Sequence, residues 1–540
     1  MSRVIFHDQP PAPQINLTRA DVACFVGLVR ILPGATVPAT LQPWLNSLGY
    51  ANTQIASLTN VPILIENYSQ FTALFDPGGS AQSFGTDYVA ACVRSFFAQG
   101  GRRCYVVRID DPVTSTDDQP VSTTNSQTIK QFKLQELLPN PTFALDDARS
   151  WTGVGCLSAL QDVSFLITPD LPVLCASQPA GAVGQIPSAP TGPEQFVECS
   201  QGELTPPSYR TYASPAPRLS VNDYATWAGA VASIVNYLAE GSARYEPHLR
   251  EIQFVTSMPL PQDLDAAAAA ENPSSTELAQ DIHDVVQAHL PESVLDDEGA
   301  SAGNISSAFL QLAYPWLKTT ASNMLLELLE PPEGALTGIL ARNALTRGTF
   351  TSATKITPAE IYDLWPTLPQ QETQNSAAPL AWDNTSPQTK ALIERISLFG
   401  FAPDGIELLS DVTAYPGESY RFAPVNRLVS VICRAARTMG ETAIFESNGP
   451  ALWGRVQRFL QTLMTRLWNL NALDGSTVQQ AFSVRCDRST MTQNDLDNGR
   501  LIAQVTFTPA SLIETITVNL ALETSGTSAQ EISASMAEAS

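Results

Sequence analysis

One short region near the C-terminus holds residue types that could perform chemistry. Cys486 precedes an aspartate, and a loop shortly after it carries Asp495, Asp497 and Gly499. A cysteine near a suitable base can act as a nucleophile, and carboxylates in a glycine-containing loop can bind calcium. Residues 482–510 therefore raise two hypotheses, a thiol active site and a metal site.

The thiol hypothesis requires a histidine that lies close enough to the cysteine to act as its base. The chain has four histidines, His7, His248, His283 and His289. The first lies on an N-terminal arm, and the others lie in or near connecting regions. An unrelated α/β enzyme that uses Cys486 with Asp495 and Asp497 is therefore the weaker interpretation, and we expect no enzyme.

The metal hypothesis fails on spacing. A calcium loop with Gly499 at its sixth position would place Leu496 at position 3 and Val505 at position 12, and neither side chain has an oxygen ligand. No set of three or four nitrogen or sulfur ligands has the spacing of a zinc site. The stretch "QGGRRC" resembles a phosphate loop only in its glycines. We expect no metal and no cofactor.

The same region has the pattern of two strands joined by a polar loop. Apolar and polar residues alternate around Val484, and again around Val505. The Asp, Asn and Gly residues between them favour a turn, and Thr490 or Thr492 could cap a short helical turn. A further period-two strand follows, with one face formed by Leu512, Ile516, Val518, Leu520 and Leu522.

A helix is predicted just before these strands. Pro450 suits its first turn. One apolar stripe follows, formed by Leu452, Val456, Phe459, Leu460, Leu463, Met464 and Leu467. Arg455, Arg458 and Arg466 lie mostly off this stripe. They form either a solvated face or a surface that contacts a partner.

The composition narrows the classes of function. At 540 residues the chain is long enough for roughly 3–4 domains. Its 30 Lys+Arg against 53 Asp+Glu give a net charge of −23, which disfavours direct binding of nucleic acid. The longest apolar run, Val22 to Val29, is too short to cross a bilayer, so we expect no membrane insertion.

Targeting and redox signals agree with a chain made in the cytoplasm. The first residues, "MSRVIFHDQP", lack the apolar region of a signal peptide. The eight cysteines lie far apart, mostly in apolar surroundings, and no C-x-x-C occurs. We expect buried free thiols rather than a disulfide framework.

Changes of composition divide the chain into five parts. Residues 1–20 form an arm, with a short β-like run at Val4, Ile5 and Phe6 before several prolines. The other expected parts are a first α/β segment at 21–111, a loop-rich inserted outer region at 112–330, a C-terminal core at 331–509, and an arm strand with a disordered tail at 510–540. The fold class expected is α+β or α/β, with several domains.

The C-terminal core resembles a known family. The stretch "AFSVRCDRSTMTQNDLDNGRL", with the "ALWGRVQRFL" helix before it, resembles the C-terminal domain of contractile tail sheath proteins. These coat the tubes of myophages, R-type tailocins and phage-like contractile injection systems. Other blocks resemble the family in the same order, namely "FVGLV", "VAACVRSFFAQGGRRCYVVRI", "LQDVSFLITPDL", "PPEGALTGILARNALTRGTF" and "VNRLVSVICRAAR". The family's Pro-Gly arm is replaced by "SRVIFHDQ".

This resemblance implies a structural subunit that polymerises helically around an inner tube protein and contracts to drive the tube through an envelope. The implied partners are further copies of the chain, the tube, and baseplate and cap or terminator proteins. The subunit would become a component of a virion or phage-tail-like particle. A baseplate- or cap-proximal paralogue, and a non-contractile structural or adhesion protein, stay as alternatives.

The resemblance also implies how copies are linked. We expect Val4–Phe6 and Leu512–Leu522 to complete the β-sheet of adjacent subunits by pairing with the strands that hold Val484 and Val505. The alternative is that residues 512–522 pair within their own sheet. Arg455, Arg458 and Arg466 are the candidates for contact with the tube.

Overall fold

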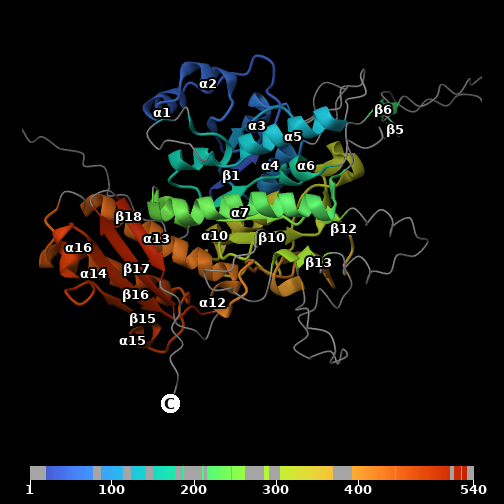
Figure 1. Cartoon of the computed structure of the whole chain (residues 1–540). Coiled ribbons are helices and arrows are strands. Elements are labelled where there is room, and N and C mark those ends of the chain that lie inside the picture. Colours follow the sequence, from blue (N-terminus) through green and yellow to red (C-terminus); the bar gives the residue numbers. More distant parts are fainter. Residues whose placement is uncertain are drawn as a thin grey trace, which may run out of the picture.

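The computed structural model describes residues 20–76, 87–112, 123–140, 147, 150–177, 185–187, 209–211, 216–244, 246–261, 282, 285–286, 288–290, 305–368, 392–443, 446–510, 516–523 and 526–531. The expectations for Val4, Ile5, Phe6, His7, His283 and Leu512 lie outside these residues. Figure 1 shows a large lobe and, beside it, a smaller C-terminal lobe drawn in orange and red.

Eight strands form the sheet of the large lobe. Their order is β14 (Gly405–Leu408), β13 (Ser397–Ala402), β10 (Leu310–Tyr314), β8 (Gln253–Ser257), β4 (Phe165–Ile167), β1 (Ala23–Gly27), β3 (Cys104–Arg108) and β2 (Pro62–Ile65). The six inner strands are parallel, and the two edge strands run antiparallel to their neighbours. Parallel strands are covered on both faces, which explains the fully apolar character of segments such as "ACFVG".

The strands do not follow the expected division of the sequence. Residues 112–330 were expected to form inserted outer domains, yet β4, β8 and β10 from this range lie in the middle of the sheet. β1 and β3 come from the range 21–111, and β13 and β14 from 331–509. The three ranges therefore share one sheet. Long Pro-, Gly- and Ser-rich connections give this range the composition of an insertion, although its short strands belong to the middle of the sheet.

Two helices of the large lobe pack unusually closely. They are α4 (Tyr88–Ala98) and α10 (Glu333–Thr346). A Cβ atom at Gly334 would lie 2.5 Å from Cys92 Cα, and one at Gly338 would lie 2.5 Å from the carbonyl oxygen of Phe96. Only glycine permits this approach, so the two helices contact each other through their backbones.

The remaining elements of the large lobe are shorter or lie on its surface. The helices are α1 (Gln42–Ser47), α2 (Asn52–Ser57), α3 (Tyr68–Leu74), α5 (Thr123–Leu137), α6 (Leu171–Cys175) and α7 (Val221–Arg244). The 3-10 helices are η2 (Gly153–Ala159), η3 (Pro247–Glu251), η4 (Ser322–Met324), η5 (Leu326–Leu328) and η6 (Leu392–Glu394). Three two-stranded pairs complete it, β5 (Gln185–Pro187) with β6 (Tyr209–Thr211), β7 (Arg218–Leu219) with β9 (Leu260–Pro261), and β11 (Trp316–Thr319) with β12 (Ile361–Trp365).

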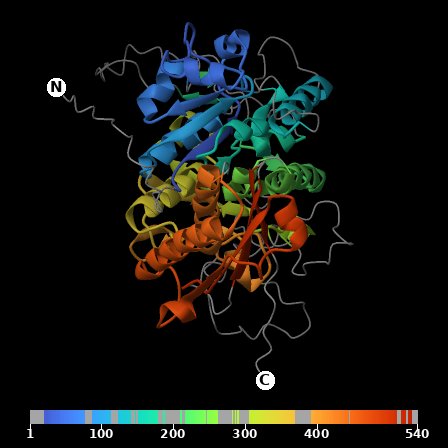
Figure 2. The ribbon, with the colours of Figure 1, turned by 90° about the vertical axis from the view of Figure 1, so that its left-hand side faces the viewer.

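The C-terminal lobe has its own antiparallel sheet and its own core. The strand order is β15 (Phe482–Arg485), β16 (Leu501–Phe507), β17 (Ile516–Glu523) and β18 (Gly526–Glu531). Its helices are α12 (Glu418–Arg421), α13 (Ala423–Ala443), α14 (Pro450–Asn469), α15 (Val478–Ala481) and α16 (Gln493–Asp497). Figure 2 shows the red strands and orange helices below the large lobe. The buried residues of the two lobes form two separate clusters.

One expectation for this lobe is confirmed and one is wrong. Pro450 lies in the first turn of α14, as the sequence predicts. Residues 526–531, expected to lie in a disordered tail, form β18 and pair with β17. In the described parts of the chain, no helix is both long and apolar enough to span a bilayer.

Candidate assembly interface

The C-terminal sheet brings together the residues expected to pair strands. Val484 faces Val505 across β15 and β16, and Val505 faces Val518 across β16 and β17. All three side chains are buried in the core formed with α13 and α14. In the same core lie Ile516 and Leu520 from β17. Alternation of period two therefore places the predicted set on one face, as the sequence indicates.

The opposite face of this sheet is open. Ser483 and Arg485 of β15 are exposed, and Ile502, Gln504 and Thr506 of β16 are half-buried. A sheet with one core face and one polar face is typical of antiparallel architecture. The lobe thus presents a flat, mostly polar surface on the side away from its helices.

The two ends of the sheet differ. β15 stands at one end, and no strand in the described part of the chain pairs with its outer edge. Gln457 Nε2 donates to the carbonyl oxygen of Val484 at 3.3 Å. β18 stands at the other end and lies against α13, α7 and η3. An open edge strand can accept a further strand through backbone hydrogen bonds.

In the single chain, β17 lies within its own sheet. It pairs with β16 in seven aligned positions, from Leu501 opposite Leu522 to Phe507 opposite Ile516. Pairing of residues 512–522 within their own sheet was the alternative to exchange between subunits. An exchanged β17 would have to make the same contacts on a second copy, because its buried side chains need this core.

The acidic loop is a turn, as its Asp, Asn and Gly residues predict. Thr492 caps α16, where its Oγ1 accepts from the N–H of Asp495 at 3.2 Å and the Asp495 carboxylate accepts from the N–H of Thr492 at 2.8 Å. The Thr492 hydroxyl also donates to the Asp495 carboxylate at 2.5 Å. This bond, followed by the one from the N–H of Thr492, holds the pKa of Asp495 below its usual value. Gly499 ends the turn with φ of 73°. The carboxylates are thus occupied by local contacts.

Cys486 lies in the core of the lobe, with 2% of its surface exposed. Burial, with a smaller contribution from Asp487, raises the pKa of its thiol to about 12. His248 lies in the large lobe, where its Nε2 is 2.9 Å from the carbonyl oxygen of Leu157. Among the described residues, no group of three His, Cys, Asp or Glu side chains is arranged to hold a metal ion.

The three arginines of α14 lie on its outer face. Arg455 forms an ion pair with Glu446, and Arg458 Nε donates to the carbonyl oxygen of Gly454 at 3.0 Å. Arg466 is exposed in the last turn of the helix. The opposite side of α14 is buried, so the helix presents a basic row to the outside of the lobe.

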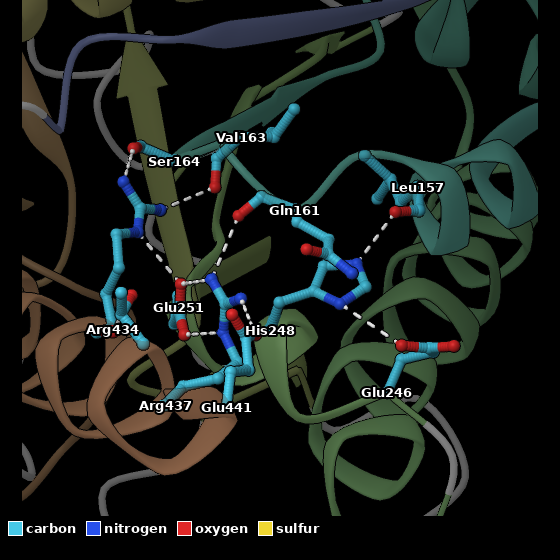
Figure 3. Close-up of polar contacts among 11 residues, drawn as sticks. Leu157, Gln161, Val163, Ser164, Glu246, His248, Glu251, Arg434, Arg437 and Glu441 are labelled. Carbon is cyan, nitrogen blue, oxygen red and sulfur yellow. Dashed lines mark hydrogen bonds and ion pairs between the residues drawn. The ribbon is translucent and has the colours of Figure 1, made fainter. Parts of the chain in front are cut away.

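A joint that the sequence analysis did not identify connects the lobes. Arg434 and Arg437 of α13 both contact Glu251 of η3, with nitrogen–oxygen distances of 2.8 Å and 2.7 Å. Arg434 also donates to the carbonyl oxygen of Val163 at 2.8 Å, and Arg437 to that of Gln161 at 3.0 Å (Figure 3). Glu251 is 3% exposed, so the carboxylate at the centre of the joint is buried.

A second buried pair lies nearer the start of α13. The two terminal nitrogens of Arg427 contact the two carboxylate oxygens of Asp411, at 3.0 Å and 2.6 Å. Asp411 also accepts from Gln311 Nε2 at 3.0 Å and from the N–H of Ala353 at 2.9 Å. Arg427, Arg434 and Arg437 share one face of a helix, and this spacing was the available sequence signal.

Comparisons with known proteins identify the C-terminal lobe. Residues 416–523 match the family model described as the phage tail sheath C-terminal domain. A chain of the anti-feeding prophage baseplate in its contracted state is similar over 94% of this chain and 96% of that one, with 16% identity and a TM-score of 0.54. This likeness is one of fold.

Two further solved structures are similar at lower scores. The helical sheath of the anti-feeding prophage in its contracted state shares 16% identity, with 94% and 95% of the two chains covered and a TM-score of 0.49. The sheath tail protein of Desulfitobacterium hafniense shares 10% identity, with 96% and 100% covered and a TM-score of 0.42. No curated protein matches the sequence.

Proposed function

We propose that this chain, a member of the contractile tail sheath family, polymerises helically around an inner tube and contracts to drive the tube through a target envelope. The observation that carries the proposal is a sheet with an open edge at β15, inside the region that matches the sheath C-terminal domain. Work in such a machine comes from interfaces between subunits, so the proposed role needs no catalytic residue.

Linkage between copies would use the ends of the chain. Val4, Ile5 and Phe6 of one copy would add to the open edge of β15 in the next, where backbone groups give affinity and alternate side chains set the register. Residues 512–522 would exchange by taking the place of β17 in an adjacent sheet. Such contacts join different surfaces of the two copies, so they build a helix rather than a closed pair.

Charge distribution supports an orientation for the subunit. Residues 416–523 hold ten arginines, no lysine and nine acidic residues, which gives a net charge of +1. The rest of the chain has 20 basic and 44 acidic residues, a net charge of −24. The C-terminal lobe would line the inner surface, with Arg455, Arg458 and Arg466 toward the tube, and the parts of residues 112–330 that lie outside the large sheet would face outward. Baseplate and cap proteins would contact the ends of the helix.

The test is assembly of arm variants. Deleting residues 1–12 should leave a folded, unpolymerised chain, because the β15 edge then receives no strand. Ile5→Pro should do the same, since proline removes a backbone donor, while the matched Ile5→Val should assemble normally. Negative-stain electron microscopy distinguishes the two outcomes, tubes of cogwheel cross-section or discrete particles.

Normal tubes from the deletion or from Ile5→Pro would exclude linkage by the arm. Deleting residues 510–540 is a less selective test, because it also removes Ile516, Val518 and Leu520 from the core of the lobe. Discrete globules from the full chain mixed with its tube protein would favour a non-contractile structural or adhesion protein.

A baseplate-proximal paralogue is the second candidate, favoured by the similarity in fold to a chain of the anti-feeding prophage baseplate. Localisation within the particle separates the two roles. Immunogold labelling along the whole tail is expected for the main sheath, and labelling confined to one end is expected for the paralogue.

A further inference from the structure

The order of strands reverses at β1 in the large sheet, which has β3 on one side and β4 on the other. In α/β sheets, the crevice at the carboxyl ends of such strands is the usual place for a ligand. In this chain the side chain of Asp170 fills that crevice. The N–H of Leu28 donates to Asp170 Oδ2 at 2.6 Å, and a Cβ at Gly27 would lie only 2.3 Å from the same oxygen.

Asp170 belongs to a set of buried acids, which we call the acid cluster. Its members are Asp170 after β4, Glu330 just before α10, and Glu333, the first residue of α10. All three are 0% exposed. The charge of Glu333 acts on both Asp170 and Glu330, so the three groups share one buried region.

The acid cluster has few polar contacts. Glu330 Oε1 accepts from Ser95 Oγ at 2.5 Å. Among the described residues, no hydrogen bond of normal geometry reaches Asp170 Oδ1, Glu330 Oε2 or either oxygen of Glu333. The hydroxyl and N–H of Ser257 lie near Glu333, and the Thr319 hydroxyl lies near Glu330. An unpaired carboxylate in such surroundings is costly, and a neutral carboxyl group is much less so.

The groups facing the cluster do not neutralise it. They are Asp87, Cys92 and Arg94 at α4, Lys133 on α5, Ser257 at β8 and Thr319 at β11. Lys133 faces Asp170 but pairs with Asp110 at 2.9 Å, and none of the three acids forms an ion pair with any residue that the structure describes. Asp87 adds a further negative charge near Asp170.

Burial is the main cause that raises the pKa of Glu330 and of Glu333 to about 8, and it raises the pKa of Asp170 well above its usual value. The described residues provide no metal-binding group of His, Cys, Asp and Glu, here or elsewhere. A bound proton lets these carboxyl groups stay buried without a counter-charge.

We propose that the acid cluster is a pH-sensitive structural switch. Its protonated carboxyl groups let the turn after β4 and the starts of α4 and α10 pack together, and losing the protons under alkaline conditions loosens this packing. This switch lies within one chain and does not depend on polymerisation.

The direction of the pH effect follows from the raised values. The folded chain keeps protons on Glu330 and Glu333 that the unfolded chain loses above about pH 4.3. The contribution of these two groups to stability is therefore greatest at acidic pH and declines as the pH rises toward about 8, where the folded groups also ionise. Over this range, each retained proton raises the unfolding equilibrium constant about tenfold per pH unit.

The test measures urea unfolding of the full chain from about pH 5.5 to about pH 9. The wild type should become steadily less stable as the pH rises. Glu333→Gln and Glu330→Gln keep the size of the side chain but cannot ionise, so each should reduce the dependence by about tenfold per pH unit. Glu66→Gln, at an exposed position, should behave as the wild type.

Proton release gives a second readout, which does not depend on the stability of a variant. Unfolding of the wild type at pH 7, measured by calorimetry in buffers of different ionisation enthalpy, should release protons, and fewer should be released by either glutamine variant. A wild-type pH dependence that both glutamine variants retain unchanged would overturn the proposal. So would unfolding at pH 7 without proton release.

Discussion

Arg437 holds both oxygens of Glu251, at 2.7 Å and 3.0 Å, and thereby joins a helix of the C-terminal lobe to the large lobe. Arg434 approaches the same carboxylate from the preceding turn of α13. One buried acid is thus shared by two guanidinium groups, and each of these also donates to a backbone carbonyl of the large lobe. The three side chains act as one unit, because removing the acid leaves two charges without their partner.

Glu251→Gln should therefore destabilise the chain by about 3 kcal/mol, because two nearly buried guanidinium groups lose their counter-charge. Urea unfolding measures the loss. Glu441→Gln is the matched control, since Glu441 also pairs with Arg437 but its side chain is 48% exposed. That variant should cost about 0.5 kcal/mol or less. Equal losses in the two variants would contradict a buried joint.

Charge reversal on α14 tests the proposed contact with the tube. Arg458→Glu with Arg466→Glu should weaken binding to the tube protein about tenfold at low salt, while the melting temperature stays within a few degrees of the wild type. Co-sedimentation with tube polymers at several salt concentrations measures the effect. Arg102→Glu, on an exposed position of the large lobe, is the control. Unchanged binding by the double variant would remove these residues from the interface.

Cys486 should be chemically inert in the folded chain. A pKa of about 12 leaves about one thiol in ten thousand ionised at pH 8, so alkylation should be about a thousandfold slower than in the unfolded chain. Peptide-level mass spectrometry after iodoacetamide treatment, with and without urea, gives the two rates. Rapid alkylation of Cys486 without urea would revive the hypothesis of a reactive thiol.

Val505 should be the most sensitive position of the predicted strand set. It lies between Val484 and Val518 and is fully buried, so Val505→Ala should cost about 2 kcal/mol by leaving a cavity. Gln504→Ala, one residue earlier on the open face, should cost well under 1 kcal/mol in the unassembled chain. Thermal unfolding compares the two. A greater loss of stability from Gln504→Ala than from Val505→Ala would contradict the assignment of the buried and open faces of β16.

Local patterns in the sequence predicted the C-terminal lobe well. Alternation around Val484 and Val505 predicted β15 and β16, and the apolar stripe after Pro450 predicted α14. Each pattern directly records which side of an element faces a core. The polar loop was also recognised as a turn, because Thr492, Asp495 and Gly499 are residues that cap and close short helices. Pairing between subunits stays a prediction.

Contacts between distant segments could not be predicted from local sequence patterns. Arg434 and Arg437 were visible as part of a helix, but their partner Glu251 lies more than 180 residues earlier. An arginine face is more often solvated, so only the folded chain distinguishes a joint from a surface. Asp170 and Glu333 likewise come from separate segments. Their meeting depends on how α4, α10 and β4 pack, which no local pattern records.

The position of α13 determines how the chain unfolds. Its apolar side chains, among them Val429 and Ile432, belong to the core of the C-terminal lobe, while Arg427, Arg434 and Arg437 are fixed in the large lobe. Neither lobe can melt without uncovering a face of this helix that the other lobe requires. We therefore expect the two cores to unfold as a single cooperative unit, so that a calorimetric scan of the chain should show one transition rather than two.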